Sequence, residues 1–170
     1  IIPKIRHQVN LRGADDYDII QAVNHINELD GNSKRELISR VLFYRTGIKN
    51  CYAVKTKDNI LAYIQWMIYP SQNDIIKKNF SGVFQPLKTG QVLIENVFTF
   101  PAFRGYGLMP HITAKLIEIA QNEGYKSAIM YIRKDKIESL SQNMMLGFKI
   151  TSLLRELKIF GITLRKPINI

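Results

Sequence analysis

The spacing of apolar residues predicts two helices near the start of the chain. Apolar residues recur at helical intervals over residues 17–26, directly after acidic residues that suit the positive end of a helix dipole. We expect Gly31 to end this helix. Asn32 or Ser33 can cap a second helix that runs to about Tyr44.

The pattern then becomes extended. Residues 51–55 and 60–69 are rich in β-branched and aromatic residues, and the short turn between them predicts a hairpin. Residues 70–90 are polar and contain Gly and Pro, so we expect a loop with room for a short helix. Residues 91–100 (QVLIENVFTF) predict a strong strand.

Helical and extended patterns alternate in the second half of the chain. Residues 108–122 carry the apolar stripe of an amphipathic helix. A strand is expected over residues 126–133 and a short helix over residues 137–146. Residues 148–154 and 157–164 then predict a terminal hairpin.

Together these elements predict one α/β (α+β) domain over residues 1–170, with a mixed, mostly antiparallel sheet of six to seven strands flanked by about four helices. The strands at 91–100 and 126–133 should form one parallel pair around the helix at 108–122. No apolar run reaches the roughly 18 residues that a membrane span needs. Residues 1–12 lack the features of a secretory signal.

The composition is that of a globular protein, because 46% of the residues are hydrophobic and only 22% are charged. The formal net charge of +10 raises the question of nucleic-acid binding. The basic residues are scattered, however, so a solvated basic surface or attraction of a phosphorylated ligand explains the charge better. Cys51 is the single cysteine, which excludes an intrachain disulfide and fits a reducing cytoplasm.

The segment Glu95–Leu108 (ENVFTFPAFRGYGL) is the part of the sequence that suggests chemistry. A strand runs into a glycine-containing turn that opens directly into a helix. Gly105 and Gly107 let the backbone turn tightly and expose successive N–H groups, and the helix adds its unpaired amides. Arg104 adds a fixed positive charge. A pyrophosphate would suit such a turn.

Glycine spacing alone leaves two interpretations. The dinucleotide-binding fingerprint requires a third glycine where Pro110 stands, and the Gly-Lys-Ser/Thr ending of a P-loop is missing. From spacing alone, a phosphate site and a purely structural tight turn both stay open.

Residues 100–108 (FPAFRGYGL) resemble the central acyl-CoA motif of the GNAT superfamily of N-acyltransferases, whose pattern is Pro, two residues, then Arg-Gly-x-Gly-Ile-Gly/Ala. The likeness continues downstream, where a helix ends at residues 123–125 (EGY) and residues 146–148 resemble the family's Leu-Gly-Phe. The motifs cover residues 91–148. The preceding elements match the family's order more loosely.

The resemblance implies an enzyme that transfers an acyl group, acetyl by default, from acyl-CoA to a primary amine by direct attack. It also implies that the strand at 91–100 separates from the strand at 126–133, so that free backbone groups pair with the pantetheine arm. The turn would hold the pyrophosphate. The cofactor-binding residues carried over from the family are Val97, Phe98, Thr99, Arg104, Gly105, Tyr106, Gly107, Leu108, Met109, Lys136 and Ser139.

Glu95 is the candidate catalytic base. We expect it to alternate with Val97 and Thr99 onto one face of the strand, and acidic residues recur near this position in the family. The alternative is a structural carboxylate that pairs with a nearby Lys or Arg.

Four residues of the predicted site depart from the family pattern or have an open role. Met109 stands where the family prefers Gly or Ala. Lys136 replaces a frequent Asn, and its side chain either reaches the phosphates or is solvated. Asn143 stands where many members carry the Tyr that protonates the leaving thiolate, so a neighbouring Tyr, a water or no acid must serve. Tyr106 would be a lid over the cofactor or a surface aromatic.

The remaining chemistry-bearing residues favour structural roles. Trp66 could line an acceptor pocket, but a lone Trp in a strand is more often part of the core. Cys51 lacks a partner nearby in the sequence, so a nucleophile–base pair with His111 is unsupported. We predict no metal site, because the histidines are not at metal-ligand spacing.

Two rival functions follow from the same residues. A non-catalytic acyl-CoA-binding or regulatory domain would explain Asn143 and Met109, whereas a basic nucleic-acid-binding module would show steeply salt-dependent affinity. We expect a small-molecule or peptide amine as acceptor, in a monomer or homodimer, with neither nucleic acid nor membrane as a partner.

Overall fold

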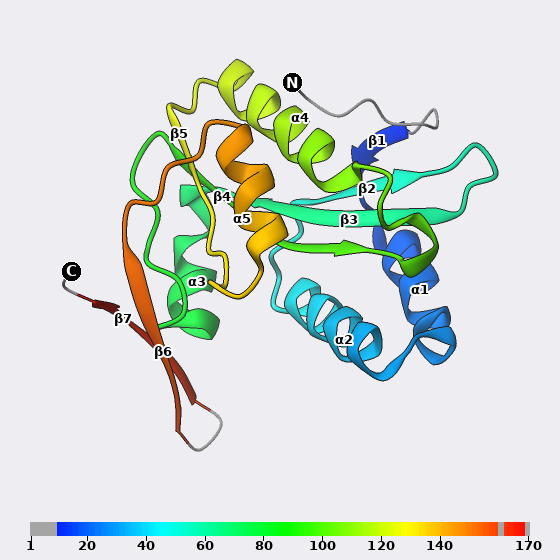
Figure 1. Cartoon of the computed structure of the whole chain (residues 1–170), viewed down its shortest axis with the longest axis horizontal. Coiled ribbons are helices and arrows are strands. Elements are labelled where there is room, and N and C mark those ends of the chain that lie inside the picture. Colours follow the sequence, from blue (N-terminus) through cyan, green and yellow to red (C-terminus); the bar gives the residue numbers. More distant parts are fainter. Residues whose placement is uncertain (1–9, 160–161, 169–170) are drawn as a thin grey trace.

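The protein is built on a five-stranded sheet with helices on both faces and a separate two-stranded hairpin (Figure 1). The computed structural model describes residues 10–159 and 162–168. The strands are β1 (Asn10–Gly13), β2 (Cys51–Lys55), β3 (Leu61–Ile68), β4 (Gln91–Thr99), β5 (Ser127–Ile129), β6 (Leu153–Ile159) and β7 (Ile162–Ile168). The α-helices of the described residues are α1 (Asp16–Asn24), α2 (Gly31–Arg45), α3 (Asn73–Phe80), α4 (Leu108–Asn122) and α5 (Ile137–Met145).

The main sheet has the strand order β1-β2-β3-β4-β5. Pairing is antiparallel from β1 to β4, and β4 and β5 are parallel with α4 as their crossover. The predicted mixed, mostly antiparallel sheet and its parallel pair are confirmed. The pattern did not predict β1, because its four residues (NLRG) contain one large apolar side chain and no alternation.

Two layers of apolar side chains hold the sheet between the helices. On one face, α1, α2 and α3 pack around Trp66, which is fully buried and donates its indole N–H to Ile48 O at 3.0 Å. On the other face, α4 contributes Ile112 and Leu116. Burial of each large apolar side chain stabilises the fold by about 1.5–3 kcal/mol. Trp66 is therefore part of the core, as expected.

The start of α2 differs from the expectation. Asp30 caps this helix, because its Oδ1 accepts hydrogen bonds from the amides of Asn32 and Ser33 at 2.9 and 3.0 Å. Gly31 is the first residue of α2 rather than the end of the preceding helix, since α1 already ends at Asn24. A carboxylate at the cap accepts two free amides and also suits the helix dipole.

The terminal hairpin lies further along the chain than predicted. The expected arms at 148–154 and 157–164 are replaced by β6 and β7, which form a sheet of their own. Glu156 and Arg165 stand directly opposite each other, and Arg165 Nε donates to Glu156 Oε2 at 3.0 Å. This cross-strand pair favours the observed register, and the apolar pattern alone does not reveal it.

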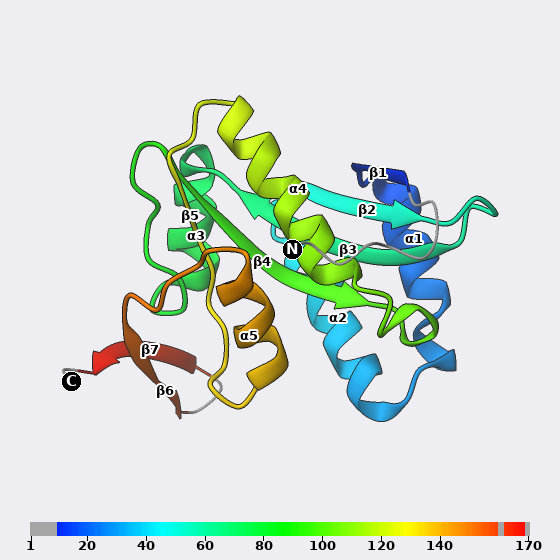
Figure 2. The ribbon, with the colours of Figure 1, turned by 45° about the horizontal axis from the view of Figure 1, so that its top comes forward.

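The hairpin contacts the body of the protein at the segment after α3. The Arg165 amide donates to Gly82 O at 2.6 Å. Gly82 has a φ of 80°, and a Cβ at this position would lie 2.7 Å from Leu164 Cδ2, so glycine suits this close approach. Figures 1 and 2 show the hairpin projecting on the α3 side of the molecule, apart from β5.

Asp18 is a buried charge that joins three elements. Its Oδ1 accepts from Arg12 Nη2 of β1 and from Lys55 Nζ of β2, both at 2.8 Å. Burial of Asp18 opposes its charged form and by itself would raise its pKa. The hydrogen bonds from Lys55 and from the Asp15 amide, together with the charge of Arg12, outweigh burial, so the pKa of Asp18 is lowered. Asp18 therefore stabilises the fold above the pKa of an unfolded aspartate, about 3.9. This stabilisation is lost as the pH falls through the lower pKa of the folded state.

Replacing Asp18 by Asn should destabilise the protein by on the order of 3 kcal/mol, because Lys55 would keep a buried ammonium group without its counter-charge. Asp58→Asn removes the same charge from an exposed turn and should change the free energy of unfolding by less than about 0.5 kcal/mol. Urea denaturation at pH 7 measures both variants. Equal unfolding midpoints would contradict this role of Asp18.

Candidate functional site

A bulge in β4 sets the geometry of the candidate site. The β3 partner of Glu95 is Trp66, and the partner of Phe98 lies only two residues away in β3. Asn96 and Val97 therefore oppose a single β3 residue. Asn96 has a φ of 56°, a left-handed conformation that asparagine tolerates better than most residues.

The bulge turns Glu95 to the opposite face of the sheet from Val97 and Thr99. Directly paired residues of antiparallel strands share a face. Glu95 thus lies on the face of Trp66, whereas Thr99 pairs with Tyr63 on the α4 face. The prediction that Glu95 alternates onto one face with Val97 and Thr99 is wrong, because the extra residue reverses the alternation.

Strands β4 and β5 part after a short parallel pairing, in which Gln91–Leu93 face Ser127–Ile129. The Phe100 amide donates to β3 at 3.0 Å, so the alternate backbone groups of Val97 and Thr99 point to the opposite edge of β4. Figure 2 shows the chain after β5 running away from β4 towards α5. The result is an open edge on β4, as expected from the family resemblance.

The Glu95 carboxylate bridges the two strands where they part. Its Oε1 accepts from the Tyr131 amide at 2.9 Å, and its Oε2 accepts from the Asn96 amide at 3.0 Å. Burial raises the pKa of this carboxyl group, while the two amides and the guanidinium groups of Arg165 and Arg40 act in the opposite direction. Glu95 is thus a carboxyl group of raised pKa at the fork between the strands.

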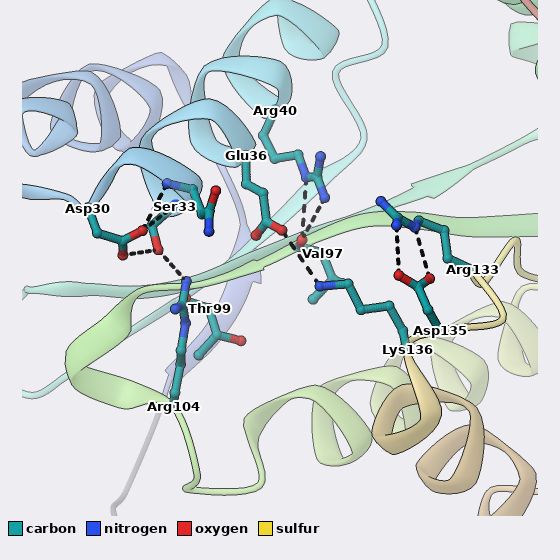
Figure 3. A network of polar contacts seen from close by, with 11 residues as sticks. Asp30, Ser33, Glu36, Arg40, Val97, Thr99, Arg104, Arg133, Asp135 and Lys136 are labelled. Carbon is teal, nitrogen blue, oxygen red and sulfur yellow. Dashed lines mark hydrogen bonds and ion pairs between the residues drawn. The ribbon is translucent and has the colours of Figure 1, made fainter. Parts of the chain in front are cut away.

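Two arginines bind the carbonyl groups of the open edge (Figure 3). Arg40 of α2 donates to Val97 O through Nε at 3.4 Å and Nη2 at 3.3 Å. Arg104 donates to Thr99 O through Nε at 3.2 Å and to Ser33 Oγ through Nη2 at 2.9 Å. The structure therefore holds the Arg104 guanidinium between the end of β4 and α2.

Lys136, the residue that precedes α5, approaches the same edge from the other side. Its Nζ lies 4.0 Å from Glu36 Oε1 of α2, and both side chains are about half exposed. Such an exposed pair contributes about 0–1 kcal/mol to stability. Arg133 binds Asp135 nearby through two N–H groups at 2.7 and 3.0 Å. Charged groups from α2 and from the segment before α5 therefore flank the open edge (Figure 3).

The glycine turn leaves the N-terminus of α4 without a side-chain cap. Gly105 and Gly107 have φ values of 79° and 73°, which residues with a Cβ rarely adopt. Leu108 and Met109 begin the helix, so their amides have no acceptor within it, and Pro110 has no amide at all. These amides and the helix dipole fit an anion such as the pyrophosphate of acyl-CoA.

Two residues that depart from the family pattern contact each other. Asn143 of α5 is buried, and its Nδ2 lies 2.8 Å from Ser139 O and 3.9 Å from Met109 Sδ. Its Oδ1 has no hydrogen-bond partner among the described residues. Because a carboxamide is not an acid near neutral pH, Asn143 does not replace the expected Tyr as a proton donor.

The structure gathers most of the predicted cofactor residues at the end of β4 and the starts of α4 and α5. Phe98 is the exception, since its side chain is buried in the core beside Phe100, with ring centroids 5.1 Å apart. The sequence pattern missed Ser33, Glu36 and Arg40 of α2. Their spacing of three and then four residues places them on one helix face, and this polar stripe was the available signal.

Comparison with known proteins identifies the fold. No family model matches the sequence, and no curated protein matches it. The N-acetyltransferase from Staphylococcus aureus Mu50 matches with a TM-score of 0.60 at 15% identity, over 93% of this chain and 94% of that chain. The GNAT-family acetyltransferase from Listeria monocytogenes 4b F2365 matches with a TM-score of 0.57 at 9% identity, over 95% and 96% of the two chains.

A third structure, a predicted acetyltransferase from Clostridium acetobutylicum with acetyl-CoA, matches with a TM-score of 0.55 at 18% identity, over 89% of this chain and 96% of that chain. The chain therefore has the fold of the GNAT acetyltransferases. This result confirms the fold predicted from the Arg-Gly-Tyr-Gly turn and the residues downstream of it.

Three further features of the described residues concern metals, membranes and the single cysteine. Within residues 10–159 and 162–168, no group of three or more His, Cys, Asp or Glu side chains could hold a metal ion. No helix in those ranges is long and apolar enough to cross a membrane. Burial raises the pKa of the Cys51 thiol, which opposes a nucleophilic role.

The left-handed turn can be tested with two glycines that have open space around them. No atom lies within 4 Å of a Cβ built on Gly105 or on Gly31, but only Gly105 has a positive φ. Gly105→Ala should therefore destabilise the protein by about 1–2 kcal/mol. Gly31→Ala, at the start of α2, should be neutral or slightly stabilising. Guanidinium denaturation compares the two, and equal stabilities would show that the turn does not require glycine.

Proposed function

We propose that this chain is an acyl-CoA-dependent N-acyltransferase of the cytoplasm, formed by one domain, that transfers an acyl group, acetyl by default, to a primary amine. The observation that carries the proposal is the open edge of β4, which leads through a left-handed glycine turn into an uncapped α4. This arrangement offers backbone donors and acceptors along the strand and an anion site at its end.

The residues of the chain would bind and orient the acyl donor. The amides at the start of α4 would hold the pyrophosphate, with Lys136 available to add a positive charge. The pantetheine arm would pair along Val97 and Thr99. Arg40 and Arg104 already bind these carbonyl groups, but a carbonyl oxygen has two lone pairs and can accept a second hydrogen bond.

The chemical step would be direct attack by the amine. The amine nitrogen forms a bond to the thioester carbonyl carbon, the carbon–sulfur bond breaks, and the thiolate leaves. Before the attack, the substrate ammonium group gives one proton to the Glu95 carboxylate, whose raised pKa makes it a better base than an ordinary glutamate. After the attack, the second N–H proton passes to the departing thiolate, so the products are the amide and the CoA thiol. Holding both reactants together supplies much of the rate enhancement.

A second function is favoured by a specific observation. Both oxygens of Glu95 accept backbone amides, and Asn143 occupies the position of the usual acid. A domain that binds acyl-CoA without catalysing transfer would have these features. Such a domain would bind acetyl-CoA, but no amine would accelerate the release of CoA.

Arg104→Ala should weaken acetyl-CoA binding about tenfold, because a charge-assisted hydrogen bond contributes roughly 1.5–3 kcal/mol and this one holds Thr99 at the open edge. Arg35→Ala removes the same charge from an exposed side chain that donates to Gly31 O of its own helix, so it should leave the affinity unchanged. Calorimetric titration measures both. Absence of binding to the wild-type protein at millimolar acetyl-CoA would refute the proposed function.

Glu95→Gln should lower the rate of transfer about 100-fold at unchanged acetyl-CoA affinity, as expected for loss of a general base. The wild-type rate should rise as the pH passes upwards through the raised pKa of Glu95, because only the carboxylate accepts a proton. This limb should vanish in the variant. The urea midpoint of Glu95→Gln serves as the stability control, because it reports the loss of an acceptor for one backbone amide. Identical pH–rate profiles of the wild type and the variant would exclude Glu95 as the base.

A further inference from the structure

A cavity of about 320 Å³ lies between the segment after α3 and the terminal hairpin. Its walls include Phe84 and Val83 from the segment, Tyr131 from the chain after β5, and Leu154 and Arg165 from the hairpin. The volume is at the lower end of the range of small-molecule sites, which runs from about 300 to 1,000 Å³.

The walls of the cavity combine aromatic rings with positive charge. Phe84 and Tyr131 have ring centroids 5.5 Å apart, and the Arg165 guanidinium lies 5.7 and 5.3 Å from their centroids. Lys77 also lines the cavity, and none of its lining residues is acidic. Aromatic rings with Lys77 and with Arg165, which also pairs with Glu156 at 3.0 Å, favour a ligand that has an aromatic ring and a negative charge.

Arg165 has guanidinium N–H groups left to donate to such a ligand. Its side chain donates to Glu156 Oε2 at 3.0 Å and to Val83 O at 3.3 Å. A guanidinium group carries five N–H donors, so donors remain beyond these two contacts. The side chain is 22% exposed, which leaves the group accessible while its surroundings limit screening by water.

The cavity lies next to the fork of the sheet. Tyr131, one of its walls, is the residue whose amide donates to Glu95 Oε1 at 2.9 Å. The charge of Arg165 on another wall opposes the rise that burial causes in the pKa of Glu95. The cavity and the Glu95 carboxylate therefore share Tyr131 as a neighbour.

We propose that this cavity binds the non-reacting end of the amine acceptor, and that the acceptor is an aromatic amino acid. The inference rests on the proposed function and specifies its substrate class. The ring packs against Phe84 and Tyr131, the carboxylate pairs with Arg165, and the amine is directed towards Glu95. Lys77 and Arg165 repel polyamines and lysine-rich peptides from the same cavity.

The first test measures binding in the absence of acyl-CoA. Calorimetry with 3-phenylpropionate and phenethylamine compares two probes that share a ring but differ in charge. The carboxylate should bind at least tenfold more tightly. Arg165→Gln should abolish this preference, whereas Lys166→Gln, which removes the same charge from the exposed neighbouring residue of β7, should retain it.

Arg165 also contacts the hairpin, so a second variant keeps the test informative if Arg165→Gln misfolds. Leu154→Trp fills the cavity without removing a polar contact, and it should block 3-phenylpropionate while leaving acetyl-CoA affinity intact. Equal affinity for the two probes, or unchanged binding of 3-phenylpropionate to Leu154→Trp, would overturn the assignment of the cavity.

The second test is acetyl transfer to three matched amines: L-phenylalanine, phenethylamine, which lacks the carboxylate, and L-alanine, which lacks the ring. The value of kcat/KM should be at least tenfold higher for L-phenylalanine than for either control. Acetyl-CoA binding without this preference would overturn the inference and leave the proposed function standing. Binding of 3-phenylpropionate without any acetyl-CoA binding would support the cavity and refute the proposed function.

Discussion

The rest of the candidate site depends on one constraint, the bulge that inserts an extra residue into β4. It turns Glu95 to the face covered by α2 and leaves Val97 and Thr99 on the face of α4. At the same point β5 leaves β4, and the Glu95 side chain binds the Tyr131 amide that would otherwise lack its ladder partner. A straight β4 would pair with β5 along its length and present no open edge. The strain of a left-handed Asn96 is therefore placed where the sheet must open, as is common for strained residues at functional sites.

Part of the positive charge of the chain is concentrated at the open edge of β4. Arg40 and Arg104 bind the two edge carbonyl groups, and each is fixed by α2 or by a contact to it. Burial lowers the pKa of Arg40, while the charges of Glu36 and Glu95 act in the opposite direction. Keeping the Arg40 guanidinium charged at this position therefore costs desolvation free energy. The net charge of +10 thus includes cations that are fixed on backbone carbonyl groups at one edge of the sheet, and a diffuse basic surface is only part of its explanation.

The sequence predicted the parts of this fold whose signals are local. The bounds of α4 matched because its apolar stripe is continuous and a left-handed glycine precedes it. The pairing of β4 with β5 followed from the strand–helix–strand order. The failures involve distant or competing partners. The β4 bulge depends on how β3 pairs with β4, and the register of the hairpin depends on the Glu156–Arg165 pair. The short β1 is a strand because it pairs with β2. None of these contacts leaves a periodic signal in its own segment.

Met109 and Asn143, the two departures from the family pattern, lie in contact, with Asn143 Nδ2 3.9 Å from Met109 Sδ. The flexible Met109 side chain at the start of α4 packs against the Asn143 amide of α5. Asn143, in place of the family's Tyr, lacks the phenol that would protonate the leaving thiolate. A thiolate is a far better leaving group than an alkoxide, because the pKa of a thiol is only about 8.5. In the proposed reaction, transfer can therefore proceed without a general acid, and a base must deprotonate the ammonium group. Under the proposed mechanism the catalytic demand therefore falls on Glu95, whose pKa is raised by burial.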